Sequence, residues 1–387
     1  MKHKEIPKGL RDLLPVEMAE RRSSEQKALQ FLRSHGYEEV GTPTFEFLDV
    51  IDAGGSKLRE ELFLFMDREG GILSLRPELT VPIARMAATH LKDAPLPQRW
   101  CYSANVFRHV LPQKAQRREF WQVGIELLGA EGSLADAEVI SLAVKMLKEL
   151  GLQQFKISLN QIGIFNGLLE HLDLLPEQRD AIRMLVQAKD MVALQQLLEN
   201  LALPEQWQES IACLPVLHGD LSVLNRIPCL EQSPKAAAAA AELILLYEKL
   251  ADFGVGEHIV IDMGVLRGLD YYTGVVFEGY SSELGYGLLG GGRYDHLLGQ
   301  FGFDCPATGF AVGLDRLLMV LPDSPLEQRY LLGGEDLTAV LLKAETMRQQ
   351  GKIVAIDLEW RSRAELEAQA AALPGYEALF LSREEES

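Results

Sequence analysis

Arg267, Tyr271 and Tyr272 stand close together in a glycine-bounded stretch and have the chemistry of a ligand site. A guanidinium presents a planar fork that suits a carboxylate or a phosphate. The flanking runs at 258–262 and 275–277 are largely apolar and strand-like, and the glycines between them allow the sharp reversal of a hairpin. If the tyrosines lie in a strand, they point to opposite faces, so that one enters a pocket while the other packs. A surface hairpin with an incidental arginine is the alternative interpretation.

Two glycine-rich segments at 285–295 and 308–317 also permit close approach of the backbone to a ligand. Neither contains the Gly-Lys-Ser/Thr of a Walker A loop, and neither has the spacing of a dinucleotide fingerprint. The four cysteines form no C-x-x-C pair and show no metal-ligand spacing. We therefore predict neither a metal site nor a cofactor.

The composition argues against several classes of function. With 56 acidic and 38 basic residues, the chain has a formal net charge of -18, whereas nucleic-acid binders carry basic stripes that contact phosphates. No apolar run reaches the roughly 18 residues of a membrane span, and residues 1–7 lack the apolar core of a secretory signal. The scattered cysteines suit a reducing compartment. We expect a cytoplasmic protein that binds neither nucleic acid nor membrane.

The elements that would position these residues are strands with flanking helices. Periodicity and turn signals predict helices over 20–35, 76–89 and 134–150, and strands over 37–43, 62–66, 71–75, 99–106, 123–128 and 156–160. The strands at 99–106 and 123–128 would form a long hairpin around a polar, basic loop. The helix and strand that end at Pro43 are a plausible dimer edge, but they also fit an ordinary sheet edge.

From 164 to about 250 the pattern changes, because Leu, Ala, Gln and Glu dominate. Pro176, Pro204 and Pro234 stand where helices would begin, so we predict a helical insertion between two blocks of strands. A linker near 322–325 precedes a tail with helices and strands. The predicted domains are therefore a core over 1–322 and a small C-terminal α/β module over 326–387.

Taken in order, the hairpin, the helical insertion and the segments at 267–273, 290–295 and 313–316 resemble histidyl-tRNA synthetases, a class II synthetase family. The resemblance covers roughly residues 5–322. It implies an α+β fold in which a mostly antiparallel sheet is flanked by helices. The helical insertion and the small C-terminal α/β module predicted above complete this fold.

The resemblance also implies a pocket for histidine. By position it assigns the amino group to Glu78, Thr80 and Gln122, the carboxylate to Arg267, the imidazole to Glu126 and Tyr272, and the pocket walls to Tyr271 and Tyr294. The chemistry is consistent, because a zwitterion needs opposite charges at its two ends and an imidazole needs an acceptor and a hydroxyl. Each residue by itself would suggest a surface or packing role.

The nucleotide half of the site departs from the synthetase pattern. Where synthetases have a glutamate that reads adenine, this chain has Val110, and Ala115 and Gln116 replace a glycine and an arginine. The phosphate-facing arginines, Arg108 and Arg316, remain. Since loss of a purine-reading carboxylate costs about 1–3 kcal/mol, we predict an intact amino-acid half and a damaged nucleotide half.

With its short, acid-ended tail, the chain resembles the regulatory-subunit family of ATP phosphoribosyltransferase, a glycosyltransferase. That resemblance implies a non-catalytic homodimer within a hetero-oligomer, partnered with a short-form catalytic subunit. It also implies a role in the first step of histidine biosynthesis and in its inhibition by histidine. A divergent histidyl-tRNA synthetase remains an alternative, because the chain retains Arg108, Arg267 and Arg316. A free-standing histidine-binding or histidine-activating paralogue is a further alternative.

Overall fold

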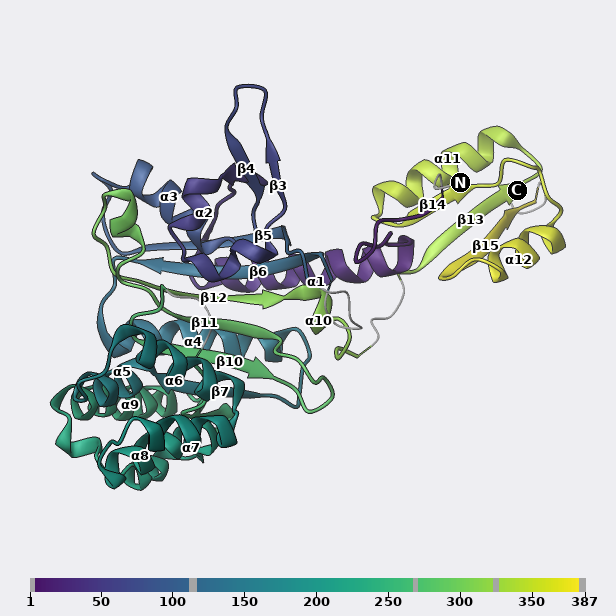
Figure 1. The fold of residues 1–387 in the computed structure, drawn as a ribbon. Helices are drawn as coiled ribbons and strands as arrows, with labels where there is room; N and C mark the ends of the chain where they lie inside the picture. The colour runs from purple at the N-terminus through teal and green to yellow at the C-terminus, as the bar shows by residue number, and fades with distance from the viewer. Residues whose placement is uncertain (1–3, 111–116, 267–270, 323–326, 383–387) are drawn as a thin grey trace. The chain divides into compact units, whose positions relative to one another are not determined.

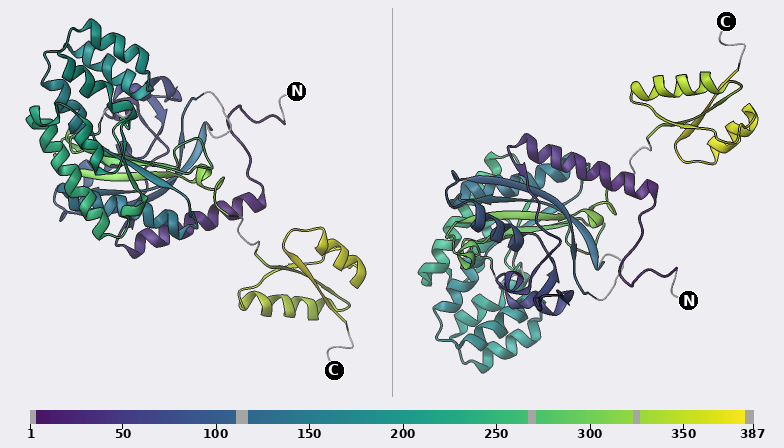
Figure 2. Two further views of the ribbon diagram at one scale, coloured as in Figure 1. Left: turned by 90° about the horizontal axis from the view of Figure 1, so that it is seen from below. Right: turned by 90° about the horizontal axis from the view of Figure 1, so that it is seen from above.

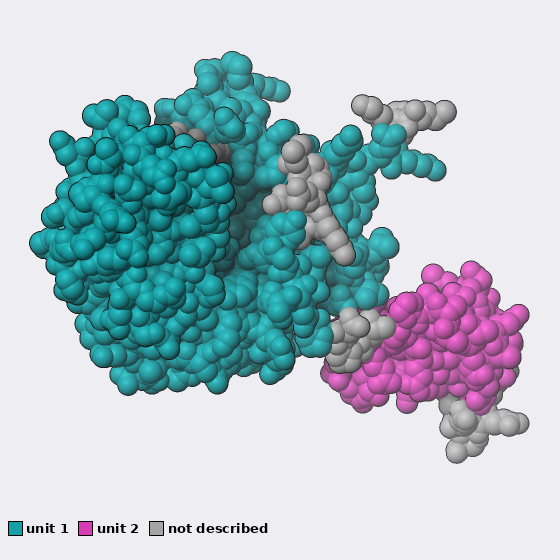
Figure 3. Space-filling model, turned by 60° about the horizontal axis from the view of Figure 1, so that its bottom comes forward, with its two compact units in different colours: residues 1–322 teal, residues 323–387 magenta. Residues whose placement is uncertain are grey.

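The computed structural model describes residues 4–110, 117–266, 271–322 and 327–382. The chain divides into two compact units, residues 1–322 and 323–387, coloured separately in Figure 3. Within the described residues, the first unit is built on a nine-stranded sheet of order β1-β5-β6-β12-β11-β10-β7-β9-β8. None of the described helices combines the length and apolar character needed to cross a membrane.

The large sheet is mostly antiparallel, as predicted. Its strands are β1 (Glu38–Glu39), β5 (Gln98–Phe107), β6 (Glu119–Leu128), β7 (Lys156–Gln161), β8 (His218–Gly219), β9 (Ile259–Asp262), β10 (Val275–Tyr280), β11 (Leu289–Arg293) and β12 (Ala307–Gly313). Only the described pairs β1–β5 and β7–β9 are parallel. The predicted hairpin is formed by β5 and β6, but β6 begins at Glu119 because Phe120 and Trp121 pair with Val106 and Asn105.

Alternation along the strands gives the sheet two different faces. On β6, Val123, Ile125 and Leu127 pack in the core with α1 (Pro15–Ser34) and α4 (Gly132–Glu149). The residues between them face the other side, where α3 (Thr80–His90) packs with Tyr102 and Leu128. Figures 1 and 2 show the helices on either side of the strands. Helix α1 starts earlier than predicted, with Pro15 in its first turn.

A small sheet of order β2-β4-β3 is joined to α3 by the ion pair of Glu46 with Arg85 at 2.7 Å. It contains β2 (Phe45–Phe47), β3 (Leu64–Met66) and β4 (Ile72–Leu75), with α2 (Leu48–Asp52) after β2. The β3–β4 hairpin confirms the predicted one. The remaining short elements of this unit are 3-10 turns at Ser56–Glu61, Leu214–Val216, Leu221–Arg226, Leu230–Gln232, Gly256–His258 and Leu298–Phe301, and α10 (Leu314–Leu317).

The insertion is helical, as the prolines predict. It contains α5 (Ile162–Glu170), α6 (Pro176–Ala188), α7 (Met191–Asn200), α8 (Glu205–Ala212) and α9 (Pro234–Asp252). Pro176 and Pro234 open their helices, and Pro204 directly precedes α8. The insertion also contributes β8, which pairs with β9 at the sheet edge.

One predicted hairpin is wrong. The strands on either side of the Arg267 stretch exist as β9 and β10, but β7 lies between them and pairs with both. The axes of β9 and β10 are therefore about 9–10 Å apart, so a tight two-residue turn does not join these strands.

The second unit contains β13 (Arg329–Gly334), α11 (Leu337–Gln349), β14 (Ile353–Ile356), α12 (Arg363–Ala371) and β15 (Tyr376–Leu381). Its three described strands are parallel, in the order β14-β13-β15. Leu332 packs with Val340 of α11, while Leu331 packs with Leu366 of α12. Because neighbouring residues of β13 contact different helices, α11 and α12 cover opposite faces. Strand β13 was not predicted from the sequence.

Candidate functional site

A cavity of about 60 Å³ lies on the α3 face of the large sheet. At about 10–15 Å³ per water, it has room for a small ligand group. The charged and hydrogen-bonding side chains around it are Glu78, Thr80, Tyr102, Arg108, Gln122, Tyr271, Tyr272 and Tyr294. Six of these were predicted from the sequence as histidine-pocket residues, and the fold brings them together from α3, β6 and the chain before β10 and after β11.

Glu126, also predicted, lies within this cluster with only 1% of its surface exposed. Its Oε1 accepts a hydrogen bond from Thr80 Oγ1 at 2.9 Å and one from the Tyr102 hydroxyl at 3.4 Å. Its Oε2 accepts one from the Tyr294 hydroxyl. Burial nevertheless raises the pKa of Glu126 to about 8, so this carboxyl holds a proton at neutral pH.

Glycines on three neighbouring strands make room for these side chains. A Cβ atom at Gly309 of β12 would lie 1.9 Å from Glu126 Oε2. At Gly124 of β6 it would lie 2.5 Å from the Tyr102 hydroxyl oxygen, and at Gly292 of β11 it would lie 2.8 Å from the Tyr272 ring. The floor of the site therefore depends on residues without side chains.

Glu78 and Gln122 supply acceptors to the cavity. The Glu78 carboxylate accepts the backbone N–H of Thr80 at 2.7 Å and that of Val81 at 2.8 Å, which satisfies two donors at the start of α3. Burial raises the pKa of Glu78, while these backbone bonds oppose the shift. Gln122 Oε1 is buried and has no hydrogen-bond partner among the described residues. Such an acceptor suits the N–H donors of a ligand.

Tyr271 and Tyr272 line the same cavity. The condition for pointing to opposite faces, a strand at these tyrosines, is not met, because residues 271–274 lie outside any strand. Their ring centroids are 4.9 Å apart, and those of Tyr271 and Tyr294 are 5.8 Å apart. The three rings form one wall of the cavity. Arg267, the predicted carboxylate partner, lies outside the described residues.

A second hollow of about 220 Å³ adjoins the cavity and shares Arg108 and Gln122 with it. It is lined by Val110 and Arg316, which the sequence assigned to the nucleotide half of the site. Arg108 Nε donates to Pro77 O and Arg316 Nη1 to Gly287 O, each at 2.8 Å. These bonds fix both arginines against the backbone. Ala115 and Gln116 lie outside the described residues.

Sequence reasoning missed Tyr102, because no motif surrounds it. It lies directly opposite Gly124 in the β5–β6 hairpin. A bulky residue paired with a glycine across two predicted strands is the signal that could have identified it. No group of three or more His, Cys, Asp or Glu side chains suited to a metal ion occurs in the part of the chain that the structure describes.

Residues 9–317 match the family model of histidyl-tRNA synthetase. The chain is 45% identical over 372 residues to the ATP phosphoribosyltransferase regulatory subunit of Moorella thermoacetica, covering 95% of this chain and 96% of that protein. It is 38% identical over 366 residues to the regulatory subunit of Desulfitobacterium hafniense, with 94% of each covered.

Solved structures agree with these sequence relatives. An ATP phosphoribosyltransferase regulatory subunit/histidyl-tRNA synthetase from Bacillus halodurans superposes with a TM-score of 0.88 at 32% identity, covering 98% of each chain. Histidyl-tRNA synthetase from Nostoc sp. has a TM-score of 0.83 at 24% identity, covering 99% of this chain and 92% of that one. The second similarity supports the fold alone.

Proposed function

The chain belongs to the histidyl-tRNA synthetase-like family of ATP phosphoribosyltransferase regulatory subunits, and from this premise we propose that it is a non-catalytic subunit that binds histidine. Its partner would be a short-form catalytic ATP phosphoribosyltransferase in the first step of histidine biosynthesis. The four unpaired cysteines are consistent with our further proposal of a cytoplasmic location.

The proposal rests on one observation: two different sets of polar groups surround the cavity. Glu78 and the unpartnered oxygen of Gln122 offer acceptors that suit an ammonium group. The buried carboxyl of Glu126 and the hydroxyls around it suit an imidazole, which has one donor and one acceptor nitrogen when neutral. Arg267 remains a predicted partner for the carboxylate.

The second hollow supports the non-catalytic assignment. Nucleotide activation needs groups that hold the adenine and the phosphates, and Val110 provides no acceptor at the position where synthetases read the base. A divergent histidyl-tRNA synthetase or histidine-activating paralogue is the second candidate. It is favoured by Arg108 and Arg316, two cations that still line this hollow.

Inhibition by histidine would follow from linkage. A ligand shifts an assembly toward an inactive state only when it binds that state more tightly than the active one. We propose that two copies of the chain associate through residues 20–43 and that the dimer carries the catalytic subunits. Histidine in the cavity would then favour the inactive arrangement.

Two assays separate the candidates. The purified chain is first tested for histidine-dependent exchange between ATP and pyrophosphate, and is then added to a short-form catalytic subunit. No exchange together with stimulated phosphoribosyl transfer supports the regulatory function. Clear exchange activity contradicts it and supports the synthetase.

The cavity is tested by calorimetry. Gln122→Leu removes the buried acceptor, so histidine should bind about tenfold more weakly, the effect of one lost hydrogen bond. Gln196→Leu, at an exposed position of α7, is the matched control and should leave the affinity unchanged. Unchanged affinity in Gln122→Leu would place histidine elsewhere.

A further inference from the structure

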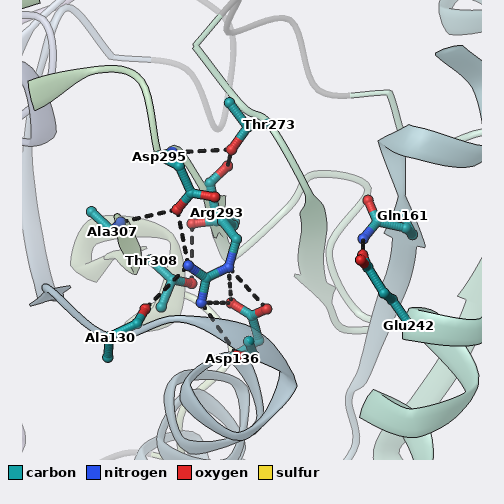
Figure 4. Close-up of polar contacts among 11 residues, drawn as sticks. Ala130, Asp136, Gln161, Glu242, Thr273, Arg293, Asp295, Ala307 and Thr308 are labelled. Atoms are coloured by element: carbon teal, nitrogen blue, oxygen red, sulfur yellow. Dashed lines mark hydrogen bonds and ion pairs between the residues drawn. The ribbon is translucent and has the colours of Figure 1, made fainter. Parts of the chain in front are cut away.

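Thr273, which directly follows Tyr272, is bonded to both neighbours of Tyr294. Its backbone N–H donates to Arg293 O at 2.8 Å. Its hydroxyl donates to the same oxygen at 3.3 Å and accepts the backbone N–H of Asp295 at 3.0 Å. Figure 4 shows the bonds of Thr273 with Arg293 and Asp295. Thr273 thus joins the segment that carries Tyr272 to the segment that carries Tyr294.

Arg293, whose carbonyl oxygen accepts both bonds from Thr273, is itself held by several contacts. Arg293 is only 7% exposed, and its Nε and Nη2 lie 3.0 and 2.9 Å from Asp136 Oδ1. Its Nη1 donates to Asp295 Oδ1 at 2.9 Å and to Ala130 O at 3.2 Å. Asp295 Oδ1 also accepts the backbone N–H of Ala307 at 3.1 Å. The start of α4, the end of β11 and the start of β12 are therefore tied together beneath Thr273 (Figure 4).

Tyr272 has little freedom to move within the cavity. Its ring lies against Gly292, where a Cβ atom would come within 2.8 Å of two ring carbons. Gly292 directly precedes Arg293, so the surface under the ring and the residue that holds Thr273 belong to the same strand. A displacement of Thr273 would therefore move Tyr272 relative to the floor of the cavity.

From these contacts we infer that Thr273 is a positioning residue of the histidine pocket, because its hydroxyl fixes Tyr272 relative to Tyr294 and Gly292. The inference rests on the proposed function for its ligand but not for its geometry. An imidazole ligand would require the tyrosine hydroxyl to be held in place, because the hydrogen bonds of the ring depend on where each hydroxyl and carboxyl lies.

The test compares two substitutions at one position in the full chain. Thr273→Val keeps the shape of the side chain but removes the hydroxyl, and should weaken histidine binding roughly 3- to 10-fold, as expected for one hydrogen bond. Thr273→Ser keeps the hydroxyl and should bind histidine within about twofold of the natural chain. Thr89→Val, an exposed position of α3 whose hydroxyl bonds only within its own helix, serves as the control and should show no change.

Two further measurements separate positioning from a general structural effect. In a Tyr272→Ala background, Thr273→Val should cause no additional loss of affinity, because the residue through which it acts is gone. Amide hydrogen exchange at Asp295 should be faster in the unliganded Val variant than in the Ser variant. If Thr273→Val does not fold, Thr273→Ala is compared with Thr273→Ser in the same way.

The outcomes are distinguishable. Natural affinity for histidine in Thr273→Val would overturn the positioning inference and leave the histidine site intact. Unchanged exchange at Asp295 would also overturn it, whatever the affinity. If the natural chain binds no histidine, the proposed function fails. The hydrogen-exchange experiment alone then decides whether the Thr273 hydroxyl fixes the chain that carries Tyr272 relative to Tyr294.

Discussion

Gly309 of β12 lies directly opposite Glu126 of β6, and the absence of a side chain at Gly309 is what admits the Glu126 carboxyl. A Cβ atom there would lie 1.9 Å from Glu126 Oε2 and 2.4 Å from Ile125 O. One of these two contacts is to backbone and cannot be relieved by a rotamer change. The pair therefore determines whether a buried acid can lie behind the residues that line the cavity.

Gly309→Ala should lower the free energy of unfolding by about 1–3 kcal/mol, since overpacking forces the strands apart, and should abolish histidine binding. Denaturant unfolding and calorimetry measure the two effects. Gly285→Ala is the matched control, because no atom lies within 4 Å of a Cβ there, and it should change stability by less than about 0.5 kcal/mol. Normal histidine affinity in Gly309→Ala would show that the ligand does not need this geometry.

Glu126→Gln should change how stability depends on pH. Burial raises the pKa of Glu126 from 4.5 to about 8, so between these values the folded chain keeps a proton that the unfolded chain has released. The natural chain therefore loses stability as pH rises through this window, by at most about 1.4 kcal/mol per pH unit. Gln does not titrate, so the variant should gain stability relative to the natural chain from pH 5 to pH 8.5.

Urea unfolding at three pH values measures this difference. Glu149→Gln, at an exposed position of α4, is the matched control for replacing a glutamate by glutamine. An equal pH dependence in Glu126→Gln and the natural chain would mean that Glu126 is ionised throughout.

Arg293→Met should destabilise the first unit by about 3–5 kcal/mol, because it leaves the carboxylate of Asp136 buried without its cation. The comparison is Arg348→Met, whose ion pair with Glu345 is exposed and should contribute no more than about 1 kcal/mol. Thermal unfolding measures both. Equal effects from the two substitutions would contradict the importance of the buried pair.

Leu366→Ala should destabilise the second unit alone. Leu366 is fully buried between α12 and β13, and removal of such a side chain costs about 2–5 kcal/mol. Hydrogen exchange should speed up in the strands of residues 329–381 and remain unchanged in β6 and β12. Leu342→Ala, at a position that is 66% exposed, is the control and should leave both units as they are.

Much of the fold was predictable from local pattern. Alternation, helical periodicity and proline positions predicted the long β5–β6 hairpin and the helical insertion, because these signals depend on residues close in sequence, whereas the mostly antiparallel sheet was implied by the family resemblance. The order of strands was not predictable in the same way. The β9–β10 hairpin was wrong because β7, about a hundred residues earlier in the chain, pairs with both strands.

The family resemblance and the types of side chain available for a histidine site could be read from the residues and their order. Which of these side chains meet depends on how distant strands pair. Tyr271 and Tyr272 line one cavity with Tyr294, which follows β11, and Tyr102 joins them because Gly124 lies opposite it. Residue types and spacing are local properties, whereas a cavity depends on non-local pairing, which places a glycine on one strand beside a carboxyl or a ring on the next.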